Sequence, residues 1–71
     1  MMQKQIEVTV NDVLSVFIAP ITLFELIGQL GLPVHATAIA LNQEITPRSL
    51  WQQTHLSNGD QISLFQAIAG G

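Results

Sequence analysis

One predicted helix lies between two groups of strand-like segments, and this order limits the folds open to the chain. Thr22 and Glu25 have the spacing of a capping box, in which each side chain binds the other residue's backbone N–H. Apolar residues follow at three- and four-residue spacing from Leu23 to Leu30, and Gly31 is suited to a left-handed helix end. The sequence therefore predicts a single short helix over this segment.

A hairpin is predicted before this helix. Over residues 3–10 apolar and polar side chains alternate with the period of two of a half-buried strand. Asn11 and Asp12 are turn formers, and residues 13–18 are rich in β-branched and aromatic side chains. Pro20 then ends the second strand.

Two further strands are predicted after the helix. Residues 37–41 are short and apolar, and Asn42 ends this strand in a turn. Pro47 is suited to begin a single helical turn, and residues 57–60 carry a turn signal. The last strand is predicted over residues 61–68.

The order strand, strand, helix, strand, strand is typical of an α+β roll, in which one helix covers one face of a mixed sheet of four to five strands. A chain of 71 residues is too short for two hydrophobic cores, so one domain is expected. We assign residues 1–67 to this domain and residues 68–71 to a flexible C-terminal tail. The small size argues against a deep active site.

Charge and composition exclude several classes of protein. Two basic residues stand against five acidic ones, and a net charge of -3 provides no cationic surface for nucleic acid. The longest apolar runs are four residues, whereas a membrane helix needs roughly 20, so no membrane association is expected. The absence of cysteine removes disulfides and thiol nucleophiles and agrees with a reducing, cytoplasmic location.

Side chains able to do chemistry are few and scattered. His35 and His55 have no cysteine, nucleophile or carboxylate at useful spacing, so we expect them at surface loop positions and expect no metal. Trp51 is interpreted as a lid on the core, with a partner contact as the alternative. No acid–base pair can be assigned among the five carboxylates, which are Glu7, Asp12, Glu25, Glu44 and Asp60.

The last four residues, Ile68-Ala69-Gly70-Gly71, carry the strongest functional signal. At an average glycine usage of ~7%, two glycines at two given positions occur together by chance about once in two hundred times. Without β-carbons they can thread a narrow channel in an extended form, which leaves the final carboxyl open to react with a nucleoside triphosphate. The alternative is an ordinary frayed terminus. We interpret the Gly71 carboxylate as the reacting group.

These residues resemble those of the ubiquitin-like β-grasp sulfur carriers, and most of all the ThiS family of thiamine biosynthesis. The resemblance covers nearly the whole chain, and one departure is Asp12, where the family often has glycine, which leaves the turn type of the first hairpin open. The matching stretches are Ala40-Leu-Asn42, Pro47-Arg48 with Trp51, Asn58-Gly-Asp60-Gln-Ile62 and Leu64-Phe-Gln-Ala-Ile-Ala-Gly-Gly71.

The resemblance implies a cycle in which the chain carries sulfur and is not itself an enzyme. It implies an adenylating, E1-like partner that uses ATP to convert the Gly71 carboxylate to an acyl adenylate. Sulfur supplied through a cysteine desulfurase then replaces AMP and gives a thiocarboxylate. Thiazole synthase receives this sulfur. No cofactor is expected on the carrier itself.

Other classes remain open from the sequence. The small subunit of molybdopterin synthase is similar in fold and chemistry, but it usually has a longer chain and a Phe-Pro-rich stretch where Gln66-Ala67 stand here. A ubiquitin-like protein modifier that forms isopeptide bonds, and a plain interaction module, are the remaining alternatives.

Alternation along the last strand predicts a docking residue. It places Ile62 and Leu64 toward the helix and Phe65 on the open face of the sheet, beside Ala38 or Ala40. An exposed aromatic close to the tail is suited to anchor both partners. We therefore predict that Phe65 binds partners together with the tail residues Ile68, Ala69 and Gly70.

Overall fold

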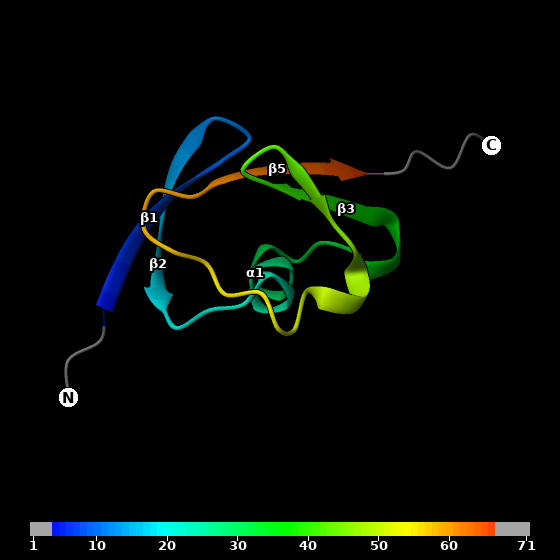
Figure 1. Cartoon of the computed structure of the whole chain (residues 1–71), viewed down its shortest axis with the longest axis horizontal. Coiled ribbons are helices and arrows are strands. Elements are labelled where there is room, and N and C mark those ends of the chain that lie inside the picture. The colour runs from blue at the N-terminus through cyan, green and yellow to red at the C-terminus, as the bar shows by residue number, and fades with distance from the viewer. Residues whose placement is uncertain (1–3, 67–71) are drawn as a thin grey trace.

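The computed structural model describes residues 4–66, which form five strands, one α-helix and two short 3₁₀ turns (Figure 1). In chain order these are β1 (Lys4–Val10), β2 (Val13–Ala19), α1 (Leu23–Leu30), η1 (Val34–Ala36), β3 (Thr37–Leu41), β4 (Glu44–Thr46), η2 (Arg48–Leu50) and β5 (Gln61–Gln66).

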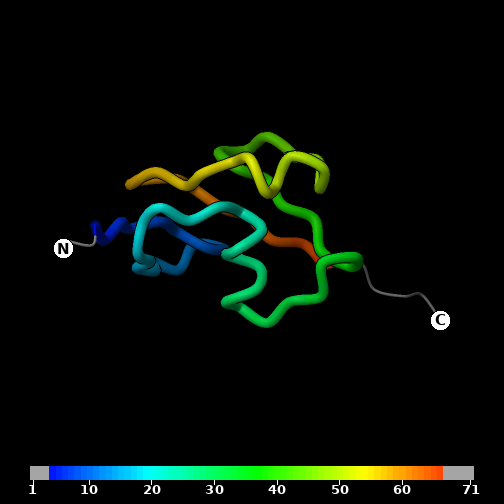
Figure 2. The backbone as a smooth tube through the Cα atoms, turned by 90° about the horizontal axis from the view of Figure 1, so that it is seen from below, coloured from blue at the N-terminus to red at the C-terminus, as the bar shows by residue number. Residues whose placement is uncertain are grey.

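The strands form one mixed sheet in the order β2-β1-β5-β3-β4. The last strand in sequence, β5, is central: it pairs in parallel with β1 and antiparallel with β3. The helix packs on one face of this sheet, so the predicted α+β roll is confirmed (Figure 1). Figure 2 shows that β1 begins near one end of the molecule and that β5 runs toward the opposite end.

The helix is determined by local signals, and its predicted bounds are confirmed. The Glu25 N–H donates to Thr22 Oγ1 at 3.1 Å, and the Thr22 N–H donates to Glu25 Oε1 at 2.9 Å, which completes the capping box. Gly31 ends the helix at φ 69°, the left-handed conformation that glycine adopts without steric cost.

The first hairpin has a two-residue turn with positive φ at both central positions. Asn11 has φ 50° and Asp12 has φ 68°, the signs that a type I′ turn requires. Asparagine and aspartate tolerate this region better than other residues with a β-carbon, so Asp12 is compatible with the turn. The Asn11 side chain also accepts a hydrogen bond from the Leu64 N–H at 2.8 Å, which fixes the hairpin against β5.

The connection between β3 and β5 contains a short strand, β4, that was not predicted from the sequence. Asn42 and Gln43 form a second two-residue turn with positive φ, and β4 pairs back against β3. Three residues are too few to show a strand period, which explains the omission. The predicted helical turn is present as η2, but Pro47 precedes it as its N-cap instead of being its first residue.

The hydrophobic core lies between the sheet and α1, and Trp51 is buried in it at 1% exposure. Its indole N–H donates to the Thr46 carbonyl oxygen at 2.9 Å, so the one polar atom of the ring is satisfied. The structural interpretation of Trp51 is confirmed. The core side chains are Ile6, Val8, Ile21, Leu23, Leu26, Ile27, Ile39, Trp51, Leu56 and Ile62.

Candidate functional site

Phe65 lies on the face of the sheet that the helix leaves open. It is 54% exposed and pairs across the strands with Ala38, whose small side chain leaves the ring uncovered. Its neighbours on β5 have the opposite orientation, since Ile62 is buried and Leu64 packs against the core. The predicted strand register and the exposure of Phe65 are therefore confirmed.

The chain's single arginine lies beside Phe65. A hollow of about 300 Å³ is lined by Phe65, Ala38, Arg48 and His35, among others. The Arg48 guanidinium donates to the His35 carbonyl oxygen at 3.2 Å and lies 5.9 Å from the centre of the Trp51 ring. These two contacts hold a cation next to an exposed aromatic ring, near the end of β5. Such a surface can bind a partner, and the described residues that line it include no activated nucleophile and no acid–base pair.

The position of Arg48 at this surface was not predicted. The only signal in the sequence was its place in the Pro47-Arg48 motif, and that motif says nothing of spatial neighbours. Of the other predicted site residues, Ile68, Ala69, Gly70 and Gly71 lie outside the described residues. In the sequence they begin two residues after Gln66, where β5 ends.

Three asparagines in turns have structural roles. Each accepts a hydrogen bond from a strand backbone: Asn11 from Leu64, Asn42 from the Gln61 N–H at 2.9 Å, and Asn58 from the Glu7 N–H at 2.8 Å. Each bond ties a turn to a neighbouring strand. The bonds of Asn11 and Asn42 hold β5 in a fixed position in the sheet, and that of Asn58 holds β1.

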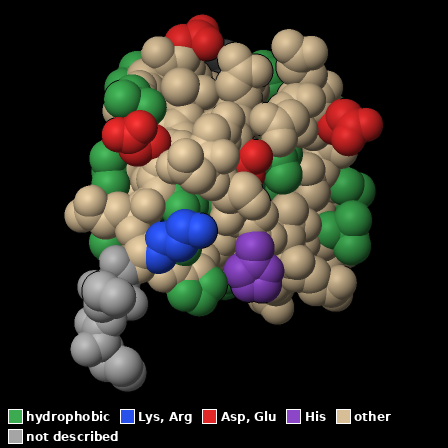
Figure 3. All heavy atoms as spheres, turned by 60° about the vertical axis from the view of Figure 1, so that its left-hand side comes forward, with side chains coloured by type: hydrophobic (Ala, Val, Ile, Leu, Met, Phe, Trp, Pro, Cys, Tyr) green, Lys and Arg blue, Asp and Glu red, His purple; other side chains and the backbone are tan. Residues whose placement is uncertain are grey.

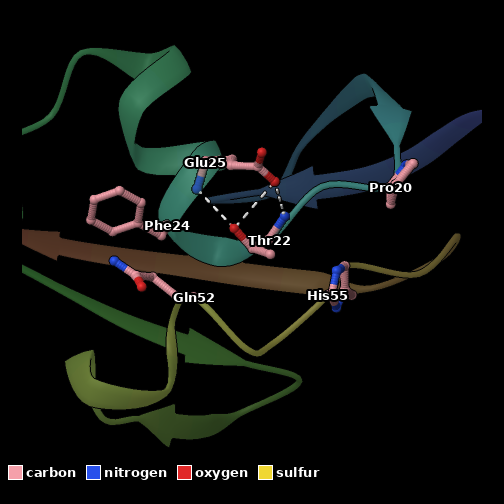
Figure 4. Close-up of a pocket in the computed structure, with 6 residues that line it drawn as sticks. All are labelled: Pro20, Thr22, Phe24, Glu25, Gln52 and His55. Carbon is pink, nitrogen blue, oxygen red and sulfur yellow. Dashed lines mark hydrogen bonds between the residues drawn. The ribbon is translucent and has the colours of Figure 1, made fainter.

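The histidines and carboxylates do not assemble a catalytic site. His35 and His55 are both exposed, as expected. The hollow in Figure 4 brings His55 and Glu25 to one surface, but the Glu25 carboxylate is engaged by the backbone and hydroxyl of Thr22. Asp60 is similarly occupied, since it accepts from the Ser57 N–H at 2.7 Å.

The charged side chains of the described residues do not form a cluster on the face drawn in Figure 3. Figure 3 shows acidic side chains lying apart from one another on one face, with hydrophobic groups between them. Residues 4–66 contain no group of three histidines or acidic residues that could hold a metal ion. Within the same residues, no helix has the length and apolar character needed to cross a membrane.

Comparison with known proteins extends the resemblance seen in the sequence. The profile of the ThiS family matches residues 2–71. The sulfur carrier protein ThiS of Escherichia coli K12 is 43% identical over 65 residues, which span 92% of this chain and 98% of that protein. A thiazole synthase of Paramagnetospirillum magneticum is 34% identical over 55 residues, or 78% of this chain, and the matched stretch is 17% of the synthase.

The fold has a close counterpart among solved structures. The crystal structure of the thiamine biosynthesis protein ThiS from Geobacter metallireducens superposes with a TM-score of 0.81. The match covers 93% of this chain and all of the other, at 23% sequence identity. The predicted β-grasp fold is thereby confirmed.

Proposed function

The chain belongs to the ThiS family and is a sulfur carrier, not a catalyst, and from this we propose that its last residue, Gly71, carries the sulfur as a thiocarboxylate. The observation that carries the proposal is the diglycine end of a chain that matches a ThiS sulfur carrier over 98% of that protein's length. The lack of any thiol in the chain also supports it, because an activated terminus then has no internal thiol to acylate.

The proposed loading takes place in a partner's active site and has three steps. A carboxylate oxygen of Gly71 attacks the α-phosphorus of ATP, and pyrophosphate leaves. The outer sulfur of a persulfide formed by a cysteine desulfurase then attacks the acyl carbon, and AMP leaves. A second thiol, supplied by the partner, attacks the other sulfur of the resulting acyl disulfide, which forms a disulfide on the partner side and releases the Gly71 thiocarboxylate. ATP is thus a substrate of the adenylating partner, and the carrier holds no cofactor. We place this cycle in the cytoplasm, where ATP and reduced sulfur are available.

Thiazole synthase is the proposed acceptor. The synthase of Paramagnetospirillum magneticum contains a stretch similar to this chain, so a carrier-like segment and a synthase occur there in one protein. Two functions joined in one chain are suited to consecutive steps. This favours the thiazole branch over molybdopterin synthesis for the sulfur held by Gly71.

The proposal is tested by loading in vitro. The chain is incubated with its adenylating enzyme, ATP and a sulfur donor, and its C-terminal peptide is then analysed by mass spectrometry. We expect the mass change of one oxygen replaced by sulfur, only when ATP is present. An unchanged peptide in a reaction that consumes ATP would refute the proposal.

Phe65 is the proposed anchor for both partners. Phe65→Asp should weaken binding of the adenylating enzyme and of thiazole synthase by at least ~2 kcal/mol, the scale of an interface hot spot. The melting temperature should change little, because the ring is exposed and outside the core. Binding is measured by calorimetry with each partner.

Leu14→Asp is the matched control for this variant. Leu14 is 64% exposed and also lies on the open face, but at the far edge of the sheet, on β2. We expect it to leave both affinities unchanged. If the Phe65→Asp variant binds both partners normally, Phe65 is not the anchor. The tail would then be the main contact between the carrier and its partners.

Gly70→Val should block loading and leave the fold intact. The added branched side chain would occupy the narrow channel through which the terminus reaches the reacting site. Gly70 lies outside the described core, so the described packing is unchanged. Gly28→Val adds the same side chain on α1, where a β-carbon meets no atom within 4 Å, and should load normally. Normal loading of Gly70→Val would refute the channel.

A further inference from the structure

The two edges of the sheet differ in how they are protected. At one edge, β4 has three residues and begins with Glu44. At the other edge, β2 has seven residues, Val13–Ala19, without a charge or a proline. Natural edge strands are usually short, charged, bulged or covered, because a bare edge is a template for another strand. Within residues 4–66, β2 pairs with β1 alone and has none of these protections.

The outward backbone groups of β2 can be assigned from the hairpin register. Val10 and Val13 close the two-residue turn, so the Val13 N–H points toward β1. The direction alternates along an antiparallel strand. Leu14, Val16 and Ile18 therefore direct their N–H and C=O groups away from the sheet.

The same three residues form an apolar row on the open face. They pair with Thr9, Glu7 and Gln5 of β1, and their exposed fractions are 64% for Leu14, 53% for Val16 and 42% for Ile18. Free hydrogen-bonding groups and an exposed apolar row thus coincide on one strand, a combination suited to strand addition.

We propose that β2 is a self-association edge, at which a second copy of this chain pairs antiparallel with a two-fold axis at Val16. In this register Val16 faces its own copy, and Leu14 faces Ile18 of the other chain. Each facing pair exchanges two backbone hydrogen bonds, since all of these residues point outward. The two apolar rows then join into one continuous patch, as an interface with two-fold symmetry requires.

The charges of the hairpin favour a second copy in this orientation. Asp12 lies in the turn at one end of β2, and Lys4 lies beside Ala19 at the other end. Antiparallel pairing brings the acidic end of one hairpin to the basic end of the other. The two Glu7 carboxylates are separated by about three strand spacings, roughly 14 Å, which exceeds the Debye length of ~8 Å at physiological salt.

This pairing leaves the proposed sulfur site free. β1 meets β5 only at Thr9 and Val10, so β5 continues past the end of the hairpin. Figure 1 shows β2 and the end of β5 on opposite sides of the molecule. Phe65 therefore stays accessible in the dimer, and the proposal does not depend on the sulfur chemistry.

Concentration-dependent measurements test the proposal. Between about 10 μM and about 1 mM, the range of weak strand pairing, we expect the mass by sedimentation equilibrium to rise from monomer toward dimer. In the same series, NMR amide signals of Leu14, Val16 and Ile18 should shift, and those of Ser15 and Phe17 should shift much less. A monomer at every concentration, or shifts centred on Phe65, would overturn the proposal.

Two substitutions of Val16 and one control at Gln61 test whether this edge forms the dimer. Val16→Lys places two ammonium groups together at the axis and should raise the dissociation constant at least about tenfold. Gln61→Lys adds the same charge two strands inward, on β5, and should not change it. Val16→Pro removes only an outward N–H, which an edge strand tolerates, and should also weaken the dimer. The melting temperature of each variant checks that it is folded. An unchanged dissociation constant in both Val16 variants would refute the proposal that β2 is the self-association edge.

Discussion

Deletion of Gly71 should reduce sulfur loading by at least about a hundredfold, the loss expected when a reacting group is moved from its productive position. The truncated chain still ends in a glycine carboxylate, that of Gly70. One residue spans at most ~3.6 Å, so this carboxylate stops short of the reacting site. The measurement is the rate of oxygen-to-sulfur exchange, by mass spectrometry, with the adenylating enzyme, ATP and a sulfur donor.

Two properties that should not depend on Gly71 serve as controls for this deletion, namely the stability of the fold and the binding of partners at Phe65. Residues 4–66 contain the described sheet and core, so the melting temperature and the effect of Phe65→Asp on affinity should be the same with or without Gly71. Equal loading rates for the truncated and full chains would show that Gly71 is not the site.

Trp51→Ala should unfold much of the protein at room temperature. The indole is 1% exposed, and the change removes its packing, its hydrogen bond to Thr46 and its contact with Arg48. Replacing a buried tryptophan by alanine costs about 3–5 kcal/mol, while a domain this small has a free energy of unfolding of only ~3–5 kcal/mol. Urea unfolding followed by far-ultraviolet circular dichroism measures the loss.

Two further variants check the reason for that loss. Trp51→Phe keeps most of the apolar packing and should lose less, about 1–3 kcal/mol, for the unsatisfied Thr46 carbonyl and the smaller ring. Leu50→Ala changes an exposed neighbour and should cost within about 0.5 kcal/mol. A stable Trp51→Ala protein would mean that the core does not depend on this ring.

Elements set by neighbouring residues could be predicted from the sequence. The capping box, the apolar stripe and Gly31 define α1 within nine residues of Thr22, and turn formers between alternating segments define the first hairpin. The short strand β4 could not be found, because its pairing with β3 and not its own pattern defines it. The central place of β5 depends on pairing with β1 across about fifty residues of sequence, which no local pattern encodes.

The candidate site could likewise be predicted only in part from the sequence. The exposure of Phe65 followed from the period of two on β5, which any half-buried strand must obey. The position of Arg48 beside Phe65 could not be predicted in this way. Arg48 lies in η2, and it is held near Phe65 by its contacts with Trp51 and with the carbonyl of His35. Local alternation thus shows which side chains are exposed, and only the tertiary structure shows which of them are neighbours.

The most direct test of the sulfur-carrier mechanism is the intact mass of the protein purified from its own cells during thiamine synthesis. We predict a fraction of molecules in which one oxygen of the Gly71 carboxylate is replaced by sulfur, and the loss of that fraction when purified thiazole synthase and its substrates are added. Gly71 joined to a lysine of another protein, or unmodified Gly71 alone while the adenylating enzyme is active, would contradict the mechanism.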